Sequence, residues 1–92
     1  MEFEWDIEKS EQNQEKHGVS FDESVVIWET TRLEVENLAY SEDGEKRSAT
    51  IGWIETKLYV AIWTKRHEKI RIISVRRARK NEEEIFFKKI RE

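Results

Sequence analysis

Cationic side chains in three places of this sequence are the groups best suited to chemistry. Lys16 and His17 lie next to each other, Arg47 stands apart, and a third group follows between residues 69 and 79. That group consists of Arg71, Arg76, Arg77 and Arg79. A guanidinium binds phosphate oxygens in two-point contacts and keeps its charge. A histidine, with an ordinary pKa of about 6.5, accepts or donates a proton at neutral pH.

Other kinds of site find little support in the sequence. Two histidines fifty positions apart and no cysteine give no spacing typical of metal ligands. Three scattered glycines do not form a phosphate-binding loop. Ser74 has no glycine-flanked elbow that would make it a nucleophile. We therefore expect neither a metal nor a cofactor.

The arginine-rich segment 69–79 reads as a β-strand near the centre of a sheet, because β-branched residues fill its middle. Strict alternation predicts two faces. One face carries Ile70, Ile72, Ser74 and Arg76, and the other carries Arg71, Ile73, Val75 and Arg77. The alternative is an ordinary central strand whose arginine side chains extend into solvent and have no binding role.

The histidine stands at the end of a predicted helix over residues 7–17. Asp6 is suited to its N-cap, Gly18 to its left-handed C-terminal position, and a short strand over residues 3–5 precedes it. One helical face carries Lys9, Asn13, Lys16 and His17, as a polar site requires. The alternative for His17 is a structural role, in which its positive charge is stabilised by the helix dipole.

The remaining elements follow from local patterns. A capping box at residues 20–23 opens a second helix that reaches Glu29, and its core stripe comprises Phe21, Ser24, Val25 and Trp28. Strands are predicted over residues 33–36, 47–54 and 58–64, with turns at 41–44, 55–57 and 66–68. A closing helix begins near Asn81 and carries an apolar stripe formed by Ile85, Phe86 and Ile90.

This order of elements predicts one α+β domain over residues 1–92. We expect the helices to gather on one side of a mostly antiparallel sheet, leaving the other sheet face free to bind a ligand. The absence of cysteine, of a long apolar run and of a basic leader favours a cytoplasmic protein without a membrane segment.

The net charge of −3 conceals a strong asymmetry. Residues 1–45 hold 14 acidic and three basic side chains, for a net charge of −11, whereas residues 46–92 hold 14 basic and six acidic ones, for +8. Such a chain can offer a basic surface to a polyanion, or folding can mix the two halves and cancel the field. Charge alone therefore does not establish nucleic-acid binding.

Three sequence blocks resemble the BrnT family, the toxins of type II toxin–antitoxin pairs. The first is Trp5-Asp6-x-x-Lys9-x-x-x-Asn13-x-x-Lys16-His17-Gly18-Val19-x-Phe21. The others are Glu45-x-Arg47-x-x-x-Ile51-Gly52 and Arg71-Ile72-Ile73-Ser74-Val75-Arg76-Arg77-Ala78. The chain departs from the family where Val75 replaces a common alanine. It departs again where Phe86 and Phe87 stand near a common tyrosine.

The resemblance implies a RelE-like fold, an endoribonuclease that arrests translation, and a BrnA-type antitoxin that alone contacts operator DNA. In metal-independent cleavage, Arg47 and Arg76 would stabilise the phosphorane and His17 would transfer protons, with electrostatic help from Lys16. The remaining cations would position RNA or face the antitoxin. These are Arg71, Arg77 and Arg79.

Two other functions compete with RNA cleavage. The first is a non-catalytic module of the same fold that docks an antitoxin and helps to repress the operon. The second is direct binding to duplex DNA, which the lack of a helix-turn-helix pattern or a basic recognition helix disfavours. Cleavage of RNA by the purified protein separates the leading hypothesis from the first alternative.

Overall fold

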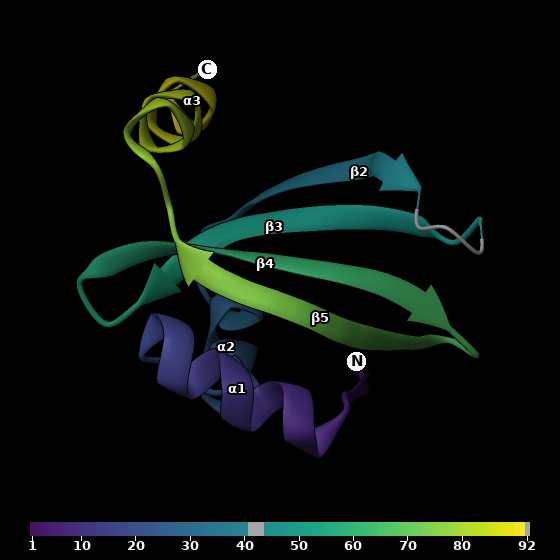
Figure 1. The fold of residues 1–92 in the computed structure, drawn as a ribbon. Coiled ribbons are helices and arrows are strands. Elements are labelled where there is room, and N and C mark those ends of the chain that lie inside the picture. The colour runs from purple at the N-terminus through teal and green to yellow at the C-terminus, as the bar shows by residue number, and fades with distance from the viewer. Residues whose placement is uncertain (41–43, 92) are drawn as a thin grey trace.

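A computed structural model describes residues 1–40 and 44–91. The elements in chain order are β1 (Phe3–Glu4), α1 (Ile7–His17), α2 (Phe21–Ser24), the 3-10 helix η1 (Val25–Glu29), β2 (Leu33–Tyr40), β3 (Lys46–Ile54), β4 (Lys57–Arg66), β5 (Lys69–Arg77) and α3 (Lys80–Ile90). The strands form one sheet in the order β1-β5-β4-β3-β2 (Figure 1). β1 runs parallel to β5, and the other pairs are antiparallel. The predicted α+β class is confirmed.

The ends of the first two helices follow the local signals in the sequence. Asp6 Oδ1 accepts hydrogen bonds from the backbone nitrogens of Glu8 and Lys9, at 2.9 and 3.2 Å. Gly18 has φ +76°, a left-handed conformation that glycine adopts at little cost because it has no Cβ. The predicted capping box between Ser20 and Glu23 is also present. These contacts fix the direction in which the chain enters and leaves α1.

Several boundaries differ from the sequence prediction. The second helix is α-helical only to Ser24 and continues as η1, where the β-branched run Val25, Val26 and Ile27 lowers α-helix propensity. β2 extends beyond the predicted 33–36 segment. β5 is not central, because it lies second from one edge and β4 occupies the middle position. Residues 41–43 of a predicted turn lie outside the described residues.

The helices lie on both faces of the sheet, which corrects the prediction that they gather on one side. Figure 1 shows α1 and α2 against one face, the α1 face, and α3 over the other, the α3 face. Phe86 of α3 is fully buried with Ala49, Ile51, Leu58 and Val60. Ile85 and Ile90 of the predicted stripe remain 49% and 44% exposed. The α3 face is therefore only partly free.

A register shift in β5 changes which side chains share a face. Ser74 pairs with Ile62 and Ile72 pairs with Trp63, so Ile73 is an extra residue between two consecutive β4 positions. Ile70, Ile72 and Val75 therefore all join the core on the α1 face. The predicted alternation is wrong beyond Ile72. Ser74 and Arg76 lie on the α3 face, and Arg77 lies on the α1 face.

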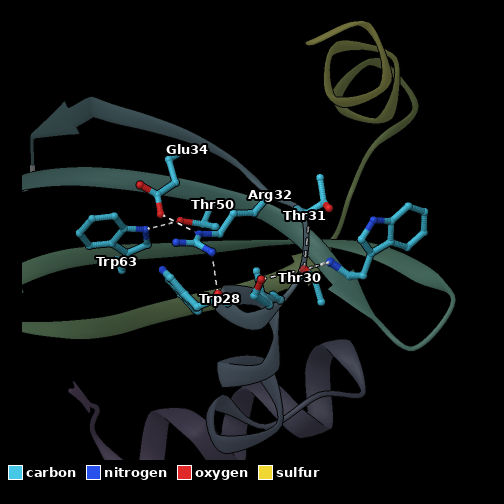
Figure 2. A network of polar contacts seen from close by, with 9 residues as sticks. Trp28, Thr30, Thr31, Arg32, Glu34, Thr50 and Trp63 are labelled. Atoms are coloured by element: carbon cyan, nitrogen blue, oxygen red, sulfur yellow. Dashed lines mark hydrogen bonds and ion pairs between the residues drawn. The ribbon is translucent and has the colours of Figure 1, made fainter. Parts of the chain in front are cut away.

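Gly52 of β3 allows the chain to pack tightly on the α1 face. A Cβ at this position would lie 2.7 Å from Ile27 Cγ2 and 3.1 Å from the Ile27 carbonyl oxygen. Arg32 then fixes the end of η1, because Nη1 donates to the Trp28 carbonyl at 2.6 Å and Nε donates to Glu34 at 3.1 Å (Figure 2). The glycine of the second sequence block thus has a packing role.

Asn13 joins α1 to β5 through its buried amide. Oδ1 accepts a hydrogen bond from Val75 N at 3.1 Å, and Nδ2 donates to Val75 O at 2.9 Å. Nδ2 also donates to Val19 O at 2.8 Å. Among the described residues, β1 pairs with β5 only at Ile70 and Arg71, so the Asn13 side chain bonds to Val75 as a neighbouring strand would.

We predict that Asn13→Ala lowers the free energy of unfolding by about 2–4 kcal/mol, because it leaves three buried backbone groups without partners. Urea denaturation followed by circular dichroism measures this change. Gln14→Ala, at an exposed neighbouring position, is the matched control and should be nearly neutral. Equal stabilities of the two variants would contradict the role assigned to Asn13.

Candidate nucleic-acid interface

Three of the predicted site arginines lie on the α3 face. Arg47 follows the alternation of β3 that buries Ala49 and Ile51 against α3. Arg71 lies between Ile70 and Ile72, which point to the opposite face. Arg76 pairs with Val60, whose side chain belongs to the α3-face core. The structure thus brings Arg47, Arg71 and Arg76 to one surface, which we call the arginine face.

The three arginines form a track along this face. Ser48 pairs with Trp63, and continuing that register by one residue aligns Arg47 with Thr64, the partner of Arg71. Two strand spacings place the Cα atoms of Arg47 and Arg71 about 10 Å apart. Arg76 lies opposite Val60 and Ile51, four residues or about 13 Å further along β3. The prediction that Arg47 and Arg76 lie on neighbouring β-strands is therefore wrong, because β4 separates β3 from β5. The two arginines suit different phosphates of one RNA strand.

Arg47 carries a buried polar atom without a partner. Its Nε has no hydrogen-bond acceptor among the described residues. An unsatisfied buried donor costs about 1–3 kcal/mol, and more when the group is charged. The charge of the guanidinium at Arg47 is therefore not compensated at its Nε by any described acceptor.

Arg76 is held by a carboxylate of α3. Nη1 and Nη2 donate to Oε1 and Oε2 of Glu82 at 2.7 and 2.8 Å. This side-chain hydrogen bond raises the pKa of Arg76 and holds the pKa of the Glu82 carboxyl below its usual range. The two side chains are only 24% and 19% exposed. The same fork geometry suits two oxygens of a phosphate.

Arg71 is also paired in this structure. Its Nη1 donates to Glu4 Oε2 at 2.6 Å, and both side chains are about 30% exposed. Glu4 lies on β1 directly opposite Arg71 in the parallel pairing. Neither carboxylate partner of these arginines was expected from the sequence, because Glu82 fitted a helix start and Glu4 fitted a short strand.

His17 lies away from the arginine face. It lines a hollow of about 270 Å³ between α1 and the edge of β5, the α1–β5 hollow. The lining residues are Lys9, Gln12, Asn13, Lys16, His17, Ile73 and Ser74. Lys16 shares this hollow with His17 as predicted, but Arg47 and Arg76 do not line it. His17 therefore lies at this hollow, whereas Arg47 and Arg76 lie on the arginine face.

Arg77 and Arg79, the two remaining predicted RNA-binding residues, lie outside the arginine face. The Arg77 guanidinium lies 5.7 Å from the ring centroid of Tyr59, on the α1 face. Arg79 is exposed at the start of α3, and its backbone nitrogen donates to Glu82 Oε1 at 2.7 Å. Arg79 remains close in sequence to the arginine face, whereas Arg77 points away from it.

The described part of the chain contains neither a membrane-spanning helix nor a cluster of metal ligands. None of its helices has the length and apolar character needed to cross a membrane. Over the same residues, no three histidine, cysteine or acidic side chains are grouped as metal ligands would be.

We predict that Glu82→Gln lowers the free energy of unfolding at pH 7 by about 1–2 kcal/mol. Because the pKa of Glu82 is lowered by folding, its stabilisation is present above the unfolded-state pKa and disappears as the pH falls through the folded-state pKa. Urea denaturation between pH 7 and pH 2 should therefore show the difference from the unsubstituted protein shrinking with acid. Exposed Glu84→Gln is the control, and an undiminished difference at pH 2 would refute the pairing.

Comparison with known protein families agrees with the resemblance seen in the sequence. Residues 5–82 match the model of the family described as the ribonuclease toxin BrnT of type II toxin–antitoxin systems. The match runs from Trp5, next to β1, through β2, β3, β4 and β5 to Glu82 of α3. A search of curated proteins finds no match. This chain belongs to the BrnT family of ribonuclease toxins.

Proposed function

We propose that this protein is a metal-independent endoribonuclease with a RelE-like fold that arrests translation by cleaving RNA in the cytoplasm. Its family supplies the class of activity. The observation that supports the location is the track of three arginines on one sheet face, where Arg47 Nε lacks an acceptor. Such a surface suits the phosphate backbone of RNA better than a neutral ligand.

The proposed reaction is a transesterification within the RNA. The 2′-hydroxyl gives up its proton to a general base, and its oxygen attacks the adjacent phosphorus. The bond from phosphorus to the 5′-oxygen breaks and that oxygen takes up a proton, so the products are a 2′,3′-cyclic phosphate and a 5′-hydroxyl. Negative charge develops on the phosphorane oxygens, and a preorganised cation there lowers the barrier. Arg76 is our candidate, since a phosphate replaces Glu82 with the same two-point geometry.

Arg47 and Arg71 hold the neighbouring phosphates in this proposal. Their Cα atoms lie about 10 Å apart, so they act on the strand that leads to the phosphate at Arg76 rather than on the reacting group. Arg71 exchanges Glu4 for a phosphate, whereas Arg47 gains an acceptor that its Nε lacks. Arg79 adds positive charge at the α3 end of the track.

Proton transfer by His17 is a separate part of the proposal. RNA bound on the arginine face reaches His17 only by passing over the edge of β5, where Ser74 belongs to both surfaces. Replacing His17 therefore tests this path independently of the arginines. His67, exposed in the turn between β4 and β5, is the matched histidine control.

The proposed partner is a BrnA-type antitoxin, and operator DNA is contacted only through it. The competing function is a non-catalytic module that docks the antitoxin. The ion pair between Glu82 and Arg76 favours this non-catalytic function, because it already neutralises the arginine. Both functions use the family's toxin–antitoxin context, and only RNA cleavage separates them.

We predict that the purified protein cleaves single-stranded RNA in the presence of EDTA. Arg76→Ala should reduce the rate about 100-fold or more, because one preorganised donor to the transition state is lost. His17→Ala should reduce it to a similar degree if the histidine transfers a proton. Arg91→Ala and His67→Ala are controls that should retain the full rate. Single-turnover assays of a labelled oligonucleotide measure all five proteins.

The outcomes of this assay assign each role separately. A full rate in Arg76→Ala would contradict the proposed centre, whereas a full rate in His17→Ala alone would remove only the histidine from the mechanism. No cleavage by the unsubstituted protein would favour the docking module.

A further inference from the structure

The α1–β5 hollow is lined by cations and contains no acidic side chain. Lys9, Gln12 and Lys16 stand at i, i+3 and i+7, so they share one face of α1. The acidic residues Glu8, Glu11 and Glu15 follow the same spacing one position earlier, about 100° around the helix. The helix therefore keeps its carboxylates away from the hollow and turns its lysines toward it.

The cations of this hollow have no structural partner in the described part of the chain. Lys9 and Lys16 are exposed, His17 is half-buried, and none of the three forms an ion pair or a side-chain hydrogen bond there. This differs from Arg71 and Arg76, which both have carboxylate partners. Lys16 and His17 suit the carboxyl end of the helix dipole, but no described carboxylate neutralises the three cations, so they are available to an anionic ligand.

The hollow and the arginine face meet at the edge of β5. The bulge at Ile73 turns Ser74 to the α3 face, yet Ser74 still lines the hollow. Beyond Arg71, no described strand pairs with the outer side of β5. A ligand can therefore pass from one set of cations to the other without crossing a neighbouring strand.

We propose that the α1–β5 hollow binds a phosphate of single-stranded RNA that turns over the edge of β5 from the arginine face. This inference rests on the proposed function and adds its substrate class. A duplex is too stiff to bend around one strand of a sheet, whereas a single strand turns there freely. A volume of about 270 Å³ suits one phosphate with its attached nucleoside.

The test measures binding to an oligonucleotide that cannot be cleaved because all its 2′-hydroxyls are methylated. Fluorescence anisotropy compares the Lys9→Gln/Lys16→Gln variant with Lys57→Gln/Lys88→Gln, which loses the same charge at exposed positions elsewhere. We expect the first variant to bind the single strand about tenfold more weakly. Its log–log salt slope should be shallower by about 0.7 for each lost phosphate contact. Binding of the matching duplex should be the same for both variants.

A second measurement reports on the hollow directly. The chain has two histidines, so the imidazole NMR signals of His17 and His67 serve as site probe and internal control. Adding the methylated single strand should shift the signal of His17 and leave that of His67 unchanged. Circular dichroism confirms that both lysine variants are folded.

Several results would overturn the inference. These are equal affinities and salt slopes for the two lysine variants, an unshifted His17 signal, or a loss of duplex binding by the Lys9→Gln/Lys16→Gln variant as large as its loss of single-strand binding. Weaker binding of the antitoxin alone, with RNA binding intact, would assign the hollow to a protein partner instead. Because the oligonucleotide cannot react, a failure of catalysis leaves this binding result interpretable.

Discussion

The position of α1 beside β5, and with it the α1–β5 hollow, depends on the hydrogen bonds of the Asn13 amide. This side chain pairs with both backbone groups of Val75 and with the Val19 carbonyl, so α1 is fixed to the outer side of β5 at one register. Because a side chain rather than a strand satisfies this edge, space remains beside it for the α1–β5 hollow. One amide thus stabilises the helix, prevents strand pairing at Val75 and holds Lys9 and Lys16 beside the sheet.

The bulge at Ile73 determines how charge is divided between the two sheet faces. Without the extra residue, Arg76 would point toward α1 and Arg77 toward α3. With it, Arg76 joins Arg47 and Arg71 on the arginine face, and Val75 completes the core with Ile70 and Ile72. The acidic and basic halves of the chain are partly mixed, since Glu4 of the acidic half pairs with Arg71 on that face. Arg76 is paired within the basic half, with Glu82. The overall acidic charge is compatible with a locally basic track.

Local signals in the sequence predicted the elements, whereas their placement depended on contacts distant in sequence. Asp6, Gly18 and the Ser20–Glu23 capping box act within a few residues, so they identified the starts and ends of the first helices. The bulge depends on cross-strand pairing, and the side on which α3 lies depends on burial of Phe86. Asn13 belonged to the predicted polar face of α1, but its chemistry is structural. The lysines of that face remain the candidates for binding.

In the proposed binding mode, one RNA strand contacts both the arginine face and the α1–β5 hollow by turning over the edge of β5. A crystal structure of the protein with a short 2′-methylated single strand tests it most directly. We expect phosphates at Arg76 and at Lys9 or Lys16 of the same protein molecule, with the RNA strand passing Ser74. A strand confined to one sheet face, or bound at the turn between β3 and β4, would contradict it.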